Sequence, residues 1–402
     1  PLILCEEFFM KLFKRLLVAP AVLGLISPVT ANANEVNLDI ISNYSELEEI
    51  DIDSKSFNSL PSTKQLLISG GEGMVDSHDH DNSFSTTTSA SFGADFVIGA
   101  VDGAGYKKEG VTFDYQYGMN LSTSFTGEDS LDLTIETGNA GSASATILDM
   151  NGMSDTMTLD GITYTFPLGD KTTVMVGDST DVSALYSTAC TYSAFTDLLG
   201  NCGSGTAAGL GGGSDFTASP NSASSATIAA AYDFGNGFTV AGGLSGAGGA
   251  DAGLFTKESK DVYGVQAAYT TDEYGVSLSY ALTDTAATTE SSFWGLNAFY
   301  SFEGEGLPSI SVGYESEDPS DAATKEGYFV GLTWPEIGPG SFSVGMSSTA
   351  NFLDTDTETY QYEAAYSYAI NDGITITPGA FIKEVDSGDD QTGIIVKTSF
   401  SF

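Results

Sequence analysis

The 402-residue chain carries 54 Asp and Glu residues against 13 Lys and Arg residues, which gives a formal net charge of −41 at pH 7. So acidic a protein repels phosphate backbones, which excludes nucleic acid as a partner. The composition is 41% hydrophobic, and no run of roughly 18 apolar residues lies beyond the N-terminal segment, which excludes a membrane-spanning helix there.

The N-terminal segment has the three parts of an export signal, in the stretch "MKLFKRLLVAPAVLGLISPVTANA" that begins at Met10. Basic residues come first, an apolar run over 16–26 follows, and Ala31-Asn32-Ala33 fits a small-residue cleavage site. The nine residues before Met10 fit no part of this pattern and are expected to lie upstream of the true start. We therefore expect 1–33 to be upstream residues plus signal peptide, and the mature chain to contain no arginine.

Residues 34–83 are acidic and serine-rich without hydrophobic periodicity, so we expect a flexible periplasmic segment. This stretch holds the only two histidines, His78 and His80, in "SHDHD". A His-x-His pair with aspartates can bind a transition metal weakly. A polar flank is the favoured interpretation, and we expect no metal site and no cofactor.

From residue 84 onward, apolar and polar residues alternate in one segment after another, which is the period of strands with one apolar and one wet face. Ala90, Phe92, Ala94, Phe96 and Ile98 share the apolar face of the first segment. Phe299 and Phe381 are exceptions, since they fall on the polar face.

Tight connections such as "PLGD", "GNG" and "NDG" alternate strictly with long acidic connections. The long ones are expected at roughly 99–110, 139–159, 178–225, 246–261, 282–292, 316–326, 348–359 and 384–391. Loop lengths sorted by side, with an even count of about 16 strands, are typical of transmembrane antiparallel β-barrels. A soluble sandwich has no reason to sort its loops in this way. The sequence therefore predicts an all-β fold with the barrel over 84–402.

Aromatic residues gather beside the tight connections, as in the belt at a membrane interface; the alternative is the preference of aromatic residues for strand ends. They are Tyr232, Phe234, Phe238, Tyr269, Tyr274, Tyr300, Phe302, Trp334, Phe342, Tyr368, Phe400 and Phe402. The final stretch "GIIVKTSFSF" also alternates, with its apolar residues on one face. In a closed barrel the last strand pairs with the first, so that no backbone edge meets lipid. This explains why the chain can finish on an aromatic residue.

The stretches "FSTTTSASFGADFVIGAVDG", "VTFDYQYGMNLSTSFTGEDSLDLTIETGN" and "ITYTFPLGDKTTVMVG" resemble the barrel of the cyanobacterial porins, a family described as iron-uptake or carbohydrate-selective porins. The resemblance continues through "AYDFGNGFTVAGG" and covers roughly 84–402. It implies an outer-membrane porin, usually a homotrimer, that passes inorganic ions or small sugars, with Phe402 as the signal for the barrel-assembly machinery. The cell-wall-binding domain and coiled coil of the usual members do not fit into 34–83, so the chain resembles a short variant.

If the apolar face meets lipid, the polar face lines a lumen. The expected lumen residues are Asp95, Asp114, Gln116, Asn120, Asp132, Glu136, Asp233, Gln266, Glu315, Glu363, Lys383 and Lys397. Carboxylates dominate this set, and such walls concentrate cations and repel anions. We expect weak cation selectivity; the alternative is a solvated wall with selectivity set by the pore diameter alone.

The longest connection, 178–225, is the third on its side, and in porins of this size the third outer loop folds into the barrel and narrows it. We expect a constriction loop here, the alternative being a flexible external loop. The carboxylates expected to set its charge are Asp178, Asp181, Asp197 and Asp215. Cys190 and Cys202 lie close together in an exported chain, which suggests a stiffening disulfide; the alternative is two free thiols.

A passive diffusion channel in the outer membrane is the function that these features favour, and it requires no covalent chemistry. A barrel enzyme would need a nucleophile with a base, and both histidines precede the first strand, so we expect no enzyme. The alternatives are an outer-membrane barrel that binds a partner or has a structural role, or a barrel enzyme, in each case without channel activity. A soluble glycan-binding β-structure is a further alternative, which would have polar residues on both outer faces.

Overall fold

The computed structural model describes residues 87–103, 110–178, 180, 182–202, 226–246, 256, 260–285, 289–304, 306–320, 323–348 and 358–402. The expected signal peptide, the segment 34–83 with His78 and His80, and the loop residues Asp181 and Asp215 lie outside the described residues.

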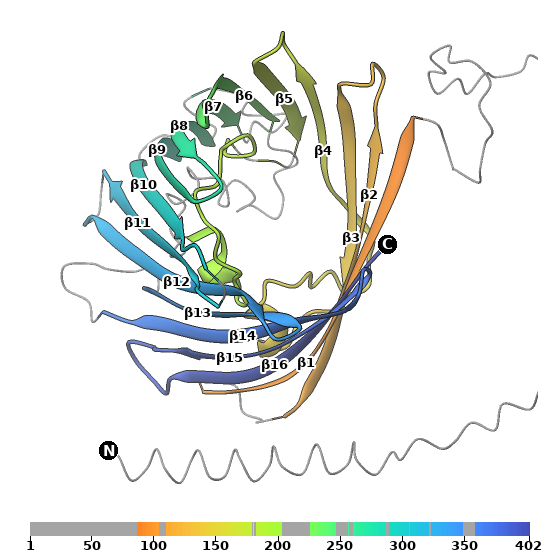
Figure 1. The fold of residues 1–402 in the computed structure, drawn as a ribbon, viewed down its shortest axis with the longest axis vertical. Coiled ribbons are helices and arrows are strands. Elements are labelled where there is room, and N and C mark those ends of the chain that lie inside the picture. The colour runs from red at the N-terminus through yellow and green to blue at the C-terminus, as the bar shows by residue number, and fades with distance from the viewer. Residues whose placement is uncertain are drawn as a thin grey trace, which may run out of the picture. The chain divides into compact units, whose positions relative to one another are not determined.

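Sixteen strands form one closed antiparallel barrel, in which β1 pairs with both β2 and β16 (Figure 1). The first eight are β1 (Thr88–Asp102), β2 (Thr112–Thr123), β3 (Ser130–Gly138), β4 (Thr158–Pro167), β5 (Thr172–Asp178), β6 (Ala226–Gly235), β7 (Phe238–Gly246) and β8 (Lys260–Thr270). The other eight are β9 (Tyr274–Thr285), β10 (Thr289–Ser301), β11 (Ser309–Pro319), β12 (Lys325–Ile337), β13 (Gly340–Ser348), β14 (Tyr360–Asn371), β15 (Ile374–Lys383) and β16 (Gln391–Ser401). Closure pairs the backbone of every strand on both sides, and the predicted 16-stranded barrel is confirmed.

Alternation along each strand sends one set of side chains outward and the next set inward. In β1, Phe96 and Ile98 are exposed on the outside, whereas Val97 and Gly99 are buried on the inside. The outward-facing side chains are largely apolar around the barrel, and without a membrane they would be exposed to water. An apolar surface of this extent is suited to contact with lipid.

Outward-facing aromatic side chains form two bands. The band beside the short turns includes Tyr232, Phe234, Phe238, Tyr274, Tyr300, Phe302 and Tyr368, and the opposite band includes Tyr263, Trp294, Tyr314, Tyr328 and Tyr362. On β9, Tyr274 and Tyr280 lie roughly 20 Å apart along the strand, with Val276 and Leu278 exposed between them. An apolar zone flanked by aromatic residues is typical of a membrane-spanning barrel. Only the first band was predicted from the sequence.

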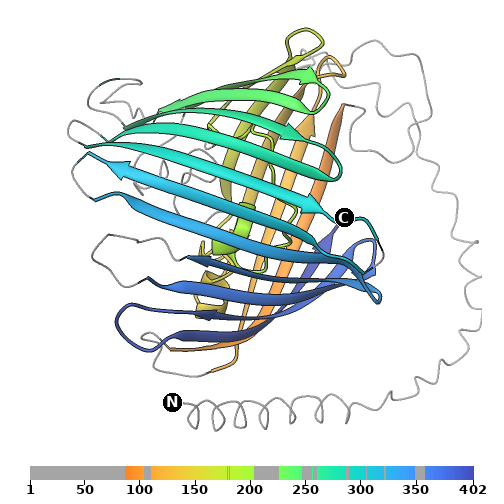
Figure 2. The ribbon, with the colours of Figure 1, turned by 60° about the vertical axis from the view of Figure 1, so that its left-hand side comes forward.

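The short connections lie on one side of the barrel, together with the C-terminal end of the chain (Figure 2). On the other side, two connections differ from expectation. Strands β9 and β10 stay paired up to Thr285 and Thr289, so that only 286–288 connect them, and 320–324 connect β11 to β12. The expected long loops at 282–292 and 316–326 are therefore wrong. Pairing continues there after the apolar alternation has stopped, because both faces of a strand are wet beyond the membrane.

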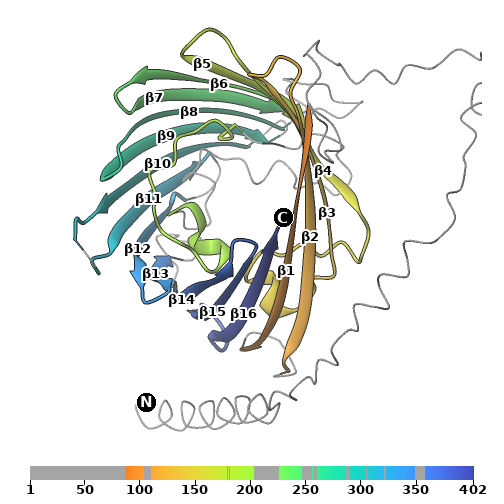
Figure 3. The same ribbon diagram turned by 45° about the vertical axis from the view of Figure 1, so that its right-hand side comes forward.

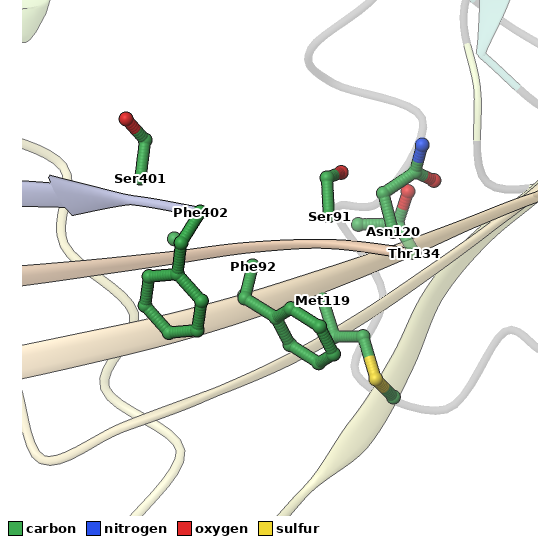
Figure 4. Close-up of a pocket in the computed structure, with 9 residues that line it drawn as sticks. Ser91, Phe92, Met119, Asn120, Thr134, Ser401 and Phe402 are labelled. Carbon is green, nitrogen blue, oxygen red and sulfur yellow. The ribbon is translucent and has the colours of Figure 1, made fainter. Parts of the chain in front are cut away.

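The junction of the first and last strands extends to the final residue. The N–H of Phe92 donates to the carbonyl of Phe402 at 2.7 Å, and the N–H of Phe402 donates to the carbonyl of Phe92 at 3.0 Å. The two rings stack with centroids 5.5 Å apart, while Ser91, Asn120 and Ser401 point to the opposite side of the wall (Figure 4). The predicted pairing of the last strand with the first is confirmed.

Two segments lie inside the ring of strands (Figure 3). Segment 139–151 follows β3 and carries helix α3 (Ala143–Thr146), and segment 182–202 follows β5 and ends in the 3₁₀ helix η3 (Asp197–Cys202). No helix in the described part of the chain is long and apolar enough to cross a membrane. A hydrophobic cluster fixes both segments to the wall and contains Val97, Val101, Ala145, Met150, Phe195, Ala365, Phe381 and Ile395. The third long connection folds inward as predicted, whereas the inward position of 139–151 was not predicted.

Candidate functional site in the barrel lumen

Segment 182–202 runs along the inner wall and is bonded to a succession of strands. Near its start, Val182 packs with Val262 of β8 and Phe293 of β10 in a buried cluster. Backbone N–H groups of the segment then donate to side chains of the wall. These bonds are Ser187 to Gln266 Oε1 in β8 at 2.8 Å, Thr191 to Ser311 Oγ in β11 at 3.0 Å, and Ser193 to Thr333 Oγ1 in β12 at 3.0 Å. Inward-facing polar side chains thus accept hydrogen bonds from backbone N–H groups of an irregular segment that is not paired with any strand.

Glu363 of β14 is the most heavily bonded attachment point of this segment. Its Oε1 accepts hydrogen bonds from the Tyr192 hydroxyl at 2.9 Å and the Phe195 N–H at 2.8 Å. Its Oε2 accepts from the Thr196 N–H at 2.8 Å and from the Thr196 hydroxyl, which in turn accepts from Gln361 Nε2 at 2.6 Å. Glu363 is only 3% exposed, so four donors compensate for the loss of water around its carboxylate. Burial and the neighbouring carboxylate raise the pKa of Tyr192, which therefore stays protonated and donates.

Glycines on the inner wall make room for the aromatic residues of the segment. A Cβ atom at Gly331 would lie 2.3 Å from the ring of Tyr192, and one at Gly379 would lie 2.4 Å from the ring of Phe195. Any larger residue at either position would push a ring off the wall. Glycine at inward positions of several strands is the sequence signal that could have located the docking surface.

A disulfide joins Cys190 to Cys202, whose Cα atoms are 6.0 Å apart. Cys202 and Leu199 pack against Phe329 of β12 in a buried cluster. The carbonyl oxygen of Cys202 approaches Gly313 of β11, where a Cβ would lie only 2.1 Å from it. The disulfide therefore ties together two points of the segment that both contact the wall.

Segment 139–151 covers the inner wall at β2 and β3. Ser142 Oγ donates to Asp114 Oδ2 at 2.5 Å, and the Asn151 N–H donates to Gln116 Oε1 at 3.1 Å. Asn151 Nδ2 also donates to Glu136 Oε2 at 2.6 Å. Three residues expected to line open lumen thus hold this segment in place. Its sequence has no periodicity that marks it as an inner segment, so its inward position could not be predicted.

All the expected lumen residues occupy inward-facing positions in the strand register. Four are buried, namely Asp114, Gln266, Glu315 and Glu363. Seven are partly accessible, namely Asp95, Gln116, Asn120, Asp132, Glu136, Lys383 and Lys397. Asp233 is exposed beside its turn, where Oδ1 accepts from the Gly235 N–H at 2.7 Å. The alternation of side chains along a strand predicts whether each residue faces inward or outward, but it does not distinguish a wall that is open to lumen water from a wall that is covered by a loop.

Among the carboxylates assigned to the constriction, Asp197 lies in the inner segment and is exposed to the lumen. The pKa of Asp197 is raised, mainly by partial desolvation and to a smaller extent by the negative charge of Asp149. The structure does not bring Asp178 to the constriction, because this residue ends β5 at an outward-facing register position. Asp181 and Asp215 lie outside the described residues.

Basic side chains are few on the described inner wall. Lys325 of β12 forms an ion pair with Glu317 of β11 at 3.1 Å. Lys383 and Lys397 also face inward, and neither forms an ion pair with another described residue. The described lumen therefore presents accessible carboxylates on β1, on β3 and on the inner segment, and ammonium groups without an ion pair at two positions.

A closed barrel with an apolar exterior, a polar interior and a loop folded into the lumen is the architecture of an outer-membrane channel protein. The sequence profile of Gram-negative porins matches residues 94–390, and the chain belongs to this family. The structure of OprB from Pseudomonas putida is similar, with a TM-score of 0.60 and 13% identity over 79% of this chain and 94% of that chain. A triple mutant of the Rhodopseudomonas blastica porin has a TM-score of 0.54 and 13% identity over 79% of this chain and 100% of that chain. At these identities the two structures support the fold alone. No curated protein sequence matches the chain.

Proposed function

We propose that this outer-membrane porin is a passive diffusion channel for inorganic ions and small hydrophilic solutes, with weak selectivity for cations. The observation that carries the proposal is the charge of the water-facing wall. Asp132 and Glu136 are partly open to the lumen and Asp197 is exposed on the inner segment, whereas only Lys383 and Lys397 supply unpaired positive charge on the described wall.

Simple electrostatics explains why this selectivity is weak. A monovalent cation that passes about 6 Å from a carboxylate in water gains about 0.7 kcal/mol, which is roughly a threefold enrichment. Salt reduces this gain, since the screening length is about 8 Å at physiological ionic strength. Buried carboxylates such as Glu315 and Glu363 contribute less, because protein rather than lumen water surrounds them.

Reversal potentials in planar bilayers under a salt gradient test the proposal. We expect the sign of cation selectivity for the unmodified chain, and a smaller potential for Asp132→Asn and for Glu136→Gln. Glu326→Gln is the matched control, because Glu326 bonds to Tyr314 at 2.9 Å on the outward face. A potential of anion-selective sign would contradict the charge argument. A folded barrel that conducts no ions would favour a binding or structural role instead.

We further propose that 1–33 are upstream residues and a signal peptide, that 34–83 form a periplasmic segment before the barrel, and that the barrel-assembly machinery reads Phe402. The export signal and the terminal strand pairing support this proposal. Mass spectrometry of the mature protein is expected to give Asn34 as the first residue. A mature chain that retains Lys11 would contradict the cleavage proposal.

The resemblance to cyanobacterial iron-uptake or carbohydrate-selective porins supports a homotrimer with inorganic ions or small sugars as permeants. Native mass spectrometry in detergent is expected to give three chains per particle, and a monomer would contradict the proposed assembly. Liposome swelling with sugars of increasing size, compared with iron-salt uptake, distinguishes the two kinds of permeant.

A further inference from the structure

A cavity of about 290 Å³ lies between the inner segment 182–202 and the wall on the short-turn side of the lumen. Strands β13 to β16 supply most of its lining, and Phe195 of the segment forms part of the rest. Seven of the lining residues are serines or threonines, one is Lys397, and none is acidic. This composition differs from that of the carboxylate-bearing wall elsewhere in the described lumen.

The ammonium group of Lys397 forms no ion pair within 4 Å in the described part of the chain. The nearest carboxylate in the strand register belongs to Asp95, one diagonal step away on β1. Both oxygens of Asp95 already accept hydrogen bonds, from Ser399 Oγ at 2.5 Å and from Gln116 Nε2 at 2.7 Å. Glu363, on the same stretch of β14 as the lining residue Ala365, is occupied by the four donors of the inner segment.

Several hydroxyl groups of the cavity are also available. Ser341 and Thr375 make no side-chain hydrogen bond within the described residues, and Thr377 Oγ1 and Ser367 Oγ bond only to each other, at 3.3 Å. A hydroxyl group can rotate to donate its proton to an acceptor. The lining therefore offers one positive charge together with several groups that can act as donors.

We propose that this cavity binds a phosphate group, either as inorganic phosphate or as the phosphate of a small ester. A phosphate oxygen is an acceptor, so it complements both the ammonium group and the hydroxyls. A neutral polyol would leave the ammonium group of the half-buried Lys397 without a counter-charge, which makes it the poorer match. The cavity is at the small end of the range for ligand pockets, which suits a ligand of this size.

This inference rests on the proposed channel function and goes beyond it. Acidic walls disfavour anions in general, so a local site is needed to concentrate one particular anion in the lumen. Phosphate bound at Lys397 would reduce the current through a pore whose wall charge by itself only weakly disfavours anions. A phosphate site therefore predicts that phosphate reduces the current at constant ionic strength, which the overall charge of the wall does not predict.

The test combines calorimetric titration of the detergent-solubilised chain with inorganic phosphate and single-channel recording at constant ionic strength. We expect saturable binding and a phosphate-dependent reduction of current in the unmodified chain. Lys397→Met is expected to weaken both at least tenfold, and Thr375→Val at least twofold. Lys383→Met removes the same charge from neighbouring β15 and is expected to change the phosphate affinity by less than twofold. Heat-modifiable migration verifies that each variant is folded.

Absence of phosphate binding in a conducting channel overturns this inference and leaves the channel function intact. Binding without conduction overturns the channel function and leaves the site intact. An equal effect of Lys383→Met and Lys397→Met would show general charge screening and refute the site. Comparing glucose with glucose phosphate shows which phosphate compound the site binds. Competition by glucose phosphate would support binding of a phosphorylated solute, whereas binding of inorganic phosphate alone would support an ion site. Equal binding of unmodified glucose would refute phosphate recognition.

Discussion

Replacing Glu363 with alanine is expected to release the inner segment from β14. The change removes four hydrogen bonds to a residue that is 3% exposed, and it leaves the N–H groups of Phe195 and Thr196 without their acceptor. A buried donor left without its acceptor typically costs about 1–3 kcal/mol, so the two N–H groups together cost about 2–6 kcal/mol. The equilibrium between the docked and released segment then shifts by roughly one to four orders of magnitude.

The rest of the segment keeps its attachments, because its bonds to β8, β11 and β12 do not involve Glu363. We therefore expect local release around Tyr192 and Phe195, not expulsion of the whole loop. The assay is single-channel recording, in which Glu363→Ala should show larger mean conductance and more current noise than the unmodified chain. Barrel stability, measured by heat-modifiable migration, should change little because Glu363 does not face lipid.

Asp132→Ala is the matched control, because it removes an inward carboxylate that makes no bond to either inner segment in the described structure. Its conductance noise should stay at the level of the unmodified chain. If Glu363→Ala leaves conductance and noise unchanged, or if Asp132→Ala reproduces its effect, Glu363 does not hold the constriction and the reasoning from its hydrogen bonds is wrong.

Three further predictions concern the constriction and the closure. The pKa of Asp197 is raised, so this carboxylate loses its charge at a higher pH than an ordinary aspartate as the pH falls. Cation selectivity should therefore begin to weaken at that higher pH. Reversal potentials from pH 7 to pH 4 measure this change, and Asp197→Asn should abolish the part that is due to Asp197. Replacing both Cys190 and Cys202 with serine should destabilise the docked segment by about 3 kcal/mol, the amount expected for a short closed loop, and increase current noise; unchanged noise would argue against a stiffening role. Phe402→Ala removes the ring that stacks on Phe92 and should lower the yield of heat-modifiable barrel in membranes, whereas an unchanged yield would show that the terminal ring is dispensable.

The strands and their facing could be predicted from the sequence because a bilayer imposes a period of two on every strand. Even the exceptions had a physical meaning. Phe381 falls on the polar face because it joins the apolar cluster beneath the inner segments, and Phe299 is buried on the inner wall, close to Gly275. At Phe381 the inward aromatic residue marks a part of the lumen that is filled by protein.

The inner segments could be predicted only in part. Loop length indicated that 182–202 folds inward, but its attachment joins Thr196 to Glu363 across 167 residues of sequence. Contacts at that separation leave no local pattern. Segment 139–151 is shorter and held by single polar side chains such as Asp114, so neither its length nor its periodicity distinguished it from an external loop.

The cluster beneath the two inner segments has a consequence for biogenesis. It brings Val97 of the first strand and Ile395 of the last into one apolar contact set with Phe195. Until β1 and β16 are paired, these surfaces are apart and Phe195 has no complete docking site. Closure of the barrel and docking of the inner segment are therefore coupled, and a barrel opened between β1 and β16 would also lose contacts that hold the inner segment on the wall.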